Sequence, residues 1–69
     1  KEQLTLREME VLQAIAKGFN TREIADLLHV SNNTIETHRK SLMSKLEARN
    51  AVDLVLKAIN LGIIPLDSK

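Results

Sequence analysis

The sequence predicts an all-α fold, a compact four-helix domain that contains a helix-turn-helix. Three observations support this prediction. Helix-start signals recur at four places along the 69 residues, no stretch alternates apolar and polar residues as strands do, and a glycine follows the first and the last predicted helix. Hydrophobic residues make up 43% of the chain, yet Phe19 is the only aromatic residue. We therefore expect a core of aliphatic side chains.

The predicted helices span residues 6–17, 21–28, 32–46 and 51–61. The first two begin with capping boxes, in which an N-cap side chain is followed three residues later by Glu. These pairs are Thr5 with Glu8 and Asn20 with Glu23. Gly18 ends the first helix, since glycine adopts the left-handed conformation at little cost.

The other two helices have weaker start signals. Ser31 is a good N-cap, but Thr34 occupies the position where a capping box has an acid. Asn50 followed by Asp53 indicates the fourth start, and Gly62 marks its end. In the short second helix, three apolar residues are expected to face the core, namely Ile24, Leu27 and Leu28.

Length and composition exclude several classes of protein. Residues 1–69 are enough for one small domain, with an expected core region of 4–62. The absence of Cys excludes disulfides, thiolate metal sites and thiol nucleophiles, and two distant histidines predict no metal site. We expect no cofactor. No apolar run approaches the ~18 residues of a membrane span and no signal peptide is visible, so we expect a cytoplasmic protein.

The helix 32–46 has an unusual polar face. Its expected core-facing residues are Ile35, Leu42 and Leu46. The side chains expected to point away from the core are Asn33, Thr37, Lys40 and Ser44, flanked by Glu36 and Ser41. Asn, Thr and Ser are poor helix formers but short hydrogen-bonding groups, which let a helix approach a groove closely. A short helix, a tight turn and this helix together predict a helix-turn-helix.

Charge adds little to this prediction. The formal net charge is +1, and residues 31–50 carry four cationic and two acidic side chains. On charge alone, a solvated helix face explains this cationic segment more simply than a nucleic-acid-binding surface does. Without further evidence, DNA binding and a helical protein-interaction module are about equally supported. An enzyme is not predicted, because no phosphate-binding loop, metal-ligand spacing or nucleophile motif occurs, and acids such as Glu8 are best explained as capping and surface residues.

Four motifs follow one another in register over residues 4–61. They are LTLREMEVL at 4–12, AKGFNTREIA at 16–25, SNNTIETHRK at 31–40, and KL followed by ARNAV within 45–52. Together they resemble the LuxR/FixJ/NarL-type helix-turn-helix domain of bacterial transcription regulators. The resemblance implies sequence-specific binding of double-stranded DNA as a homodimer through the last helix. It also implies that this chain, which begins with Lys, is the C-terminal part of a longer regulator, most often a two-component response regulator with an N-terminal regulatory domain.

The resemblance assigns roles by position. The base-contacting residues would be Glu36, Thr37 and Lys40. The DNA-backbone contacts would be Thr21, Arg22, Asn32, Asn33, Thr34, His38 and Lys45. The direction of His38 lies between the apolar line and the polar face, so a phosphate contact and a place at the core border both remain open.

Two positions depart from the family pattern. Glu36 stands where relatives often have Lys; it could accept from the N4 amino group of cytosine, or pair with Lys40 at i+4 for only ~0.2–0.5 kcal/mol. Glu47 stands where relatives often have Gly. If the backbone there is left-handed, Glu costs ~1 kcal/mol more than Gly.

The helix 51–61 is apolar over more than half of its circumference, whereas one core needs a stripe only ~100° wide. The surplus predicts a second buried surface, a dimer interface formed by Val52, Leu56 and Ile59. The alternative cover is a missing domain or the C-terminal residues Ile63, Ile64 and Leu66.

Overall fold

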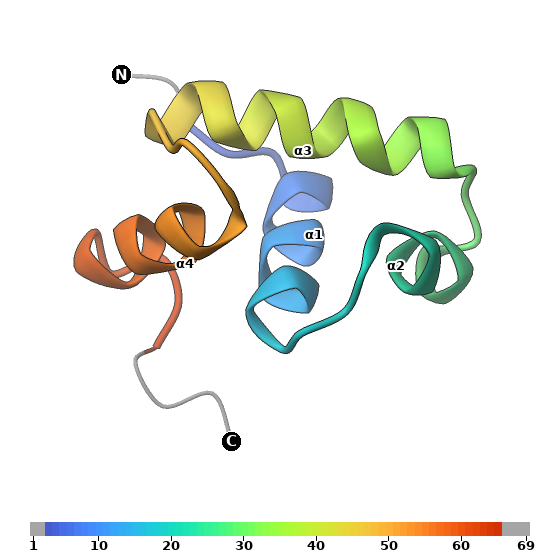
Figure 1. Ribbon diagram of the computed structural model, residues 1–69, viewed down its shortest axis with the longest axis horizontal. Coiled ribbons are helices and arrows are strands. Elements are labelled where there is room, and N and C mark those ends of the chain that lie inside the picture. Colours follow the sequence, from blue (N-terminus) through green and yellow to red (C-terminus); the bar gives the residue numbers. More distant parts are fainter. Residues whose placement is uncertain (1–2, 66–69) are drawn as a thin grey trace.

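The computed structural model describes residues 3–65, and the all-α prediction is confirmed. The four helices are α1 (Leu6–Ala16), α2 (Thr21–Leu28), α3 (Asn32–Leu46) and α4 (Ala51–Asn60). The long helix α3 runs along one side of the molecule, α1 lies against its middle, and α4 and α2 lie on either side of α1 (Figure 1).

Aliphatic side chains from all four helices form one core around α1. Its members are Val11, Leu12, Ala14, Ile15, Ile24, Ala25, Ile35, Leu42, Leu54, Ala58 and Ile64. Because α1 contacts each of the other helices, it fixes where α3 and α4 lie relative to each other. Burying aliphatic surface of this kind contributes ~25 cal/mol per Å².

The predicted N-caps are all present. Thr5 and Asn20 form complete capping boxes with Glu8 and Glu23. At the start of α3, the Ser31 hydroxyl accepts from the backbone N–H of Thr34 at 3.1 Å. The N-cap of α4 uses the Asn50 side-chain oxygen in the same way. These bonds satisfy N–H groups that have no partner within the helix.

Helix ends differ slightly from the prediction. Both α1 and α4 end one residue earlier than expected, because Lys17 and Leu61 are C-cap residues whose N–H groups still bond back into the helix. Glu47, at the C-cap of α3, has φ of 55°, so glutamate here adopts the left-handed conformation that glycine adopts at least cost.

The prediction that Leu27 faces the core is wrong. Leu27 is 56% exposed, whereas Ile24 and Ala25 are buried and Leu28 is half-buried. The core-facing side of α2 is centred between Ile24 and Ala25, and at about 100° per residue Leu27 is turned outward.

Candidate nucleic-acid interface

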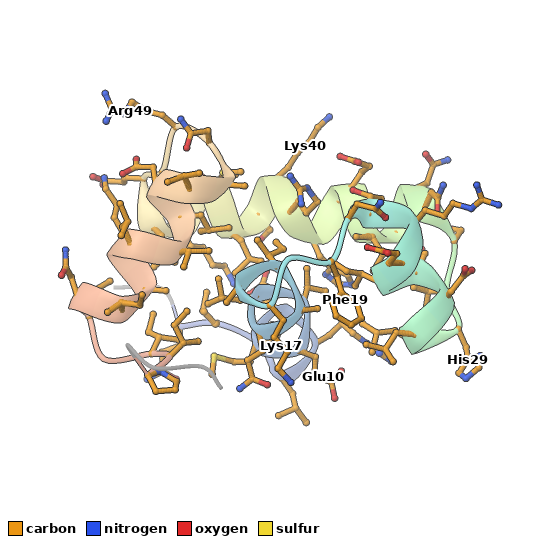
Figure 2. All side chains as sticks on the ribbon, turned by 60° about the horizontal axis from the view of Figure 1, so that its bottom comes forward. Glu10, Lys17, Phe19, His29, Lys40 and Arg49 are labelled. Carbon is orange, nitrogen blue, oxygen red and sulfur yellow. The ribbon has the colours of Figure 1, made fainter. Side chains whose placement is uncertain are left out.

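The polar face of α3 is exposed as the sequence predicts. Ile35 and Leu42 are fully buried and hold one side of the helix against the core. The exposed residues on the other side are Asn32, Asn33, Glu36, Thr37, Lys40 and Ser44. Lys40 projects away from the rest of the chain, on the side opposite Glu10 and Lys17 (Figure 2). The helix therefore offers a row of hydrogen-bonding side chains to a partner.

The hydroxyl of Thr37 forms a hydrogen bond within its own helix. Its Oγ1 donates to the backbone oxygen of Asn33 at 3.0 Å. A hydroxyl has one proton, so Thr37 presents to an outside partner only an acceptor oxygen and a methyl group.

Glu36 has a partner that neither sequence interpretation included. Its Oε2 accepts from Oγ1 of Thr21, the first residue of α2, at 2.9 Å. The ion pairs found within residues 3–65 do not include Glu36 with Lys40. The contact joins the two helices of the helix-turn-helix at their outer surface.

The other residues with a predicted backbone role surround the first turns of α2 and α3. Arg22, Asn32 and Asn33 are exposed, while Thr21, Thr34 and His38 are half-buried. Helix first turns carry unpaired N–H groups and a partial positive charge, both of which favour a phosphate group. The half-burial of His38 is compatible with both of its possible roles.

Lys45 lies in a different setting from these residues. Its ammonium donates to Glu8 Oε1 at 2.8 Å and to the backbone oxygen of Gln3 at 3.0 Å. Only 17% of the Lys45 side chain and 5% of the Glu8 side chain is exposed. The charge of Lys45 is therefore used to join α3 to α1.

Glu8 is not the surface acid that the sequence suggested. Besides its capping role, its carboxylate accepts from Lys45 and from the hydroxyl of Ser41 on α3. Burial raises the pKa of Glu8, but hydrogen bonds from Lys45, Ser41 and the Thr5 N–H outweigh burial and lower the pKa to about 2. The carboxylate is thus ionised at neutral pH, and both of its oxygens accept hydrogen bonds.

Arg49 is a cation that the residue assignments above left out. Its side chain is 88% exposed, with Nε 3.6 Å from the Asp53 carboxylate, and it projects on the same side as Lys40 (Figure 2). The sequence feature that could have indicated a role for Arg49 is its place in the positively charged segment 31–50.

The surface of α4 carries exposed apolar side chains. Val52 is 70% and Leu56 is 55% exposed, whereas Ile59 is half-buried. Val52 and Leu56 border a shallow hollow of about 250 Å³ that is lined also by Ile15, Ala51 and Val55. Of the C-terminal residues expected as alternative cover, Ile64 packs into the core, Ile63 is half-buried, and Leu66 lies outside the described residues. Val52 and Leu56 are therefore not covered by the described C-terminal residues.

Two further findings concern residues 3–65. No helix there is both long and apolar enough to cross a membrane. Across the same residues, no three His, Asp or Glu side chains gather in a way that could hold a metal ion.

A family model described as bacterial regulatory proteins, luxR family, matches residues 2–58. The chain belongs to the LuxR family. Its curated relatives include the uncharacterized response regulatory protein YgeK of Escherichia coli K12, 44% identical over 61 residues that make up 88% of this chain and 42% of YgeK. The response regulator protein VraR of Staphylococcus aureus Mu3 is 41% identical over 63 residues, 91% of this chain and 30% of VraR.

A solved structure agrees with this assignment. The response regulator ChrA of a heme-sensing two-component system superimposes on this LuxR-family chain with a TM-score of 0.89 and 31% identity, over 93% of this chain and 32% of ChrA. The LuxR-family chain thus spans less than half the length of these relatives. The matched family is one of bacterial regulatory proteins, and both relatives and the solved structure are described as response regulatory or response regulator proteins.

Proposed function

We propose that this chain binds double-stranded DNA sequence-specifically, as the effector domain of a response regulator, with α3 in the major groove. The observation that carries the proposal is the division of α3 into two sides. Ile35 and Leu42 are fully buried, while Thr37 and Lys40 are exposed on the opposite side. A helix held from behind by the core can present its outer side chains to base edges without local unfolding.

Each proposed base-contacting residue has a distinct chemistry. Lys40 donates to the O6 and N7 acceptors of guanine. Thr37 offers its methyl group to a thymine methyl, because its hydroxyl proton is bound to Asn33. The Glu36 carboxylate can only accept hydrogen bonds, so it would pair with an amino group of a base. The three side chains therefore do not compete for the same base.

The proposed phosphate contacts surround this base-contacting row. They are Arg22, Asn32, Asn33, Thr34 and His38, to which we add Arg49. Lys45 is left out of this set, because its ammonium is held by Glu8 and Gln3.

We also propose that the domain acts as a homodimer through α4, with Val52, Leu56 and Ile59 at the interface. The exposure of Val52 and Leu56 supports this, because adjacent exposed apolar side chains are typical of interaction surfaces. A two-fold dimer would place two copies of α3 in major grooves ~34 Å apart. The chain covers less than half of the response regulators that it matches, which supports a receiver domain before it in the whole protein. We also expect the protein to lie in the cytoplasm.

The test is titration of fluorescent duplex DNA, followed by anisotropy, at several salt concentrations. Log affinity should fall with log salt by ~0.9 per phosphate neutralised. Arg22→Ala and Arg49→Ala should each reduce the slope by ~1 per bound chain, hence ~2 for a dimer. Lys17→Ala, on the opposite side from Lys40 (Figure 2), should leave the slope unchanged. Undetectable or salt-independent binding would instead favour a helical protein-interaction module.

A further inference from the structure

The contact between Thr21 and Glu36 spans the helix-turn-helix. The two residues are fifteen positions apart, and the hydroxyl of Thr21 meets the carboxylate of Glu36 at 2.9 Å. Among the hydrogen bonds and ion pairs of residues 3–65, Glu36 is the one proposed base-contacting residue whose side chain is tied to a neighbouring helix. Lys40 has no such bond in that part of the chain.

A glutamate at this position needs a restraint. A carboxylate that approaches DNA is repelled by the phosphates and, if free, would turn away from the groove into water. The Thr21 hydroxyl holds Oε2 against the first residue of α2, where the helix dipole also favours negative charge. Oε1 retains its lone pairs for another donor.

The hydroxyl of Thr21 has one proton, and this bond uses it. Thr21 therefore cannot donate to a DNA phosphate while it holds Glu36. We propose that Thr21 is a positioning residue rather than a phosphate contact, and that it holds Glu36 so that the free carboxylate oxygen accepts from the N4 amino group of a cytosine. This inference rests on the proposed DNA-binding function.

The choice of cytosine follows from what each base presents in the major groove. Guanine N7 and O6 and thymine O4 are acceptors, which repel a carboxylate. Adenine has an amino group, but its acceptor N7 lies next to that amino group. Cytosine presents its amino donor with no acceptor beside it, so a fixed carboxylate oxygen prefers it.

The experiment is selection of bound duplexes from a randomised library, with sequencing, at low and moderate salt. The wild-type chain should enrich cytosine at one position of each half-site. Glu36→Gln should shift that position toward adenine, because glutamine makes paired bonds with adenine N6 and N7. Thr21→Val keeps the side-chain shape but removes the hydroxyl, and it should weaken the cytosine preference about fivefold while other positions stay unchanged. Thr21→Ser should restore the preference.

Several outcomes would overturn the inference. If Thr21→Val weakens binding to all sequences equally and lowers the salt slope, Thr21 is a phosphate contact. If Glu36→Ala, which removes every acceptor at this position, keeps the cytosine preference, Glu36 does not contact the base. This result stands even where Thr21→Val fails to fold. A wild-type chain that selects sequences without a cytosine position contradicts the inference alone. A wild-type chain that binds no DNA contradicts the proposed function as well.

Discussion

The ammonium of Lys45 on α3 lies 2.8 Å from the carboxylate of Glu8 on α1, with both side chains largely removed from water. The same carboxylate accepts from the Ser41 hydroxyl one turn earlier on α3. Glu8 thus contacts α3 at two points on its inner side. This polar contact adds to the burial of Leu42 in fixing how α3 lies on the body, and with it the direction of the proposed base-contacting side chains.

Replacing Glu8 by Gln should destabilise the fold. The substitution keeps the size of the side chain but leaves the Lys45 ammonium partly buried without a counter-charge, at an expected cost of ~2–3 kcal/mol in the free energy of unfolding. Urea unfolding followed by circular dichroism measures this. Glu10→Gln is the matched control, since its exposed ion pair with Arg7 is worth less than ~1 kcal/mol. Equal effects of the two substitutions would contradict the importance of the Glu8–Lys45 contact.

Stability should also fall in acid through Glu8. Because the pKa of Glu8 is lowered to about 2 in the folded chain and is ~4.3 when unfolded, the unfolded state binds a proton first on acidification. The stabilisation is fully present above about pH 5 and is lost as pH falls toward 2, by up to about 3 kcal/mol. The pKa of Asp53 is lowered as well, chiefly by the Arg49 N–H, so Glu8→Gln should flatten this dependence without abolishing it. Unfolding curves between pH 7 and 2.5 measure both slopes, and identical slopes would refute the assignment to Glu8.

Glu47→Gly should stabilise the domain. Glycine relieves the left-handed strain at φ of 55°, and although it adds entropy to the unfolded chain, a gain of ~0.5–1 kcal/mol is expected. The bond from Lys57 to the Glu47 backbone oxygen does not involve the side chain and should survive. Lys17→Gly is the control, because Lys17 has ordinary right-handed geometry and glycine there should destabilise. Thermal unfolding reports both effects, and a lower midpoint for Glu47→Gly would contradict the strain argument.

Val52→Glu and Leu56→Glu should abolish dimers while the helical circular dichroism signal stays unchanged. Both side chains are mostly exposed in the single chain, so a charge there costs little within the monomer but would repel its copy across a two-fold interface. Sedimentation equilibrium measures the change. Leu27→Glu, at an apolar site of similar exposure on α2, should leave association unaffected. Dimers that persist in both α4 variants would show that another surface associates.

Lys40→Ala should reduce affinity for the selected DNA site by ~1–3 kcal/mol and relax the preference at one base pair. Its exposed ammonium can reach a guanine edge when α3 lies in the major groove. Competition binding against single-base variants of the site measures the preference. Ser44→Ala, on the same face, is the control for loss of a polar surface group. Uniform weakening across all sequences would mean that Lys40 contacts only a phosphate.

Local signals in the sequence determined the helices and the outer face of α3. Capping residues such as Thr5 and Asn20 act within three residues of their partners, and helical periodicity separates Ile35 from Thr37 without reference to the rest of the chain. The left-handed residue Glu47 was foreseen only through the resemblance, which places glycine there. The assignment of base and phosphate contacts also came from the resemblance.

Tertiary structure alone decided the polar contacts between helices. Glu8 bonds to Lys45, 37 positions further along the chain, and Glu36 bonds to Thr21, 15 positions before it. Lys40, four residues after Glu36 on the same helix, does not form an ion pair with Glu36. Which charge a long side chain meets depends on how two helices cross, and that crossing is set by the packing of the whole aliphatic core. For this reason the burial of Glu8 and the bond that holds Glu36 could not be predicted from residue spacing.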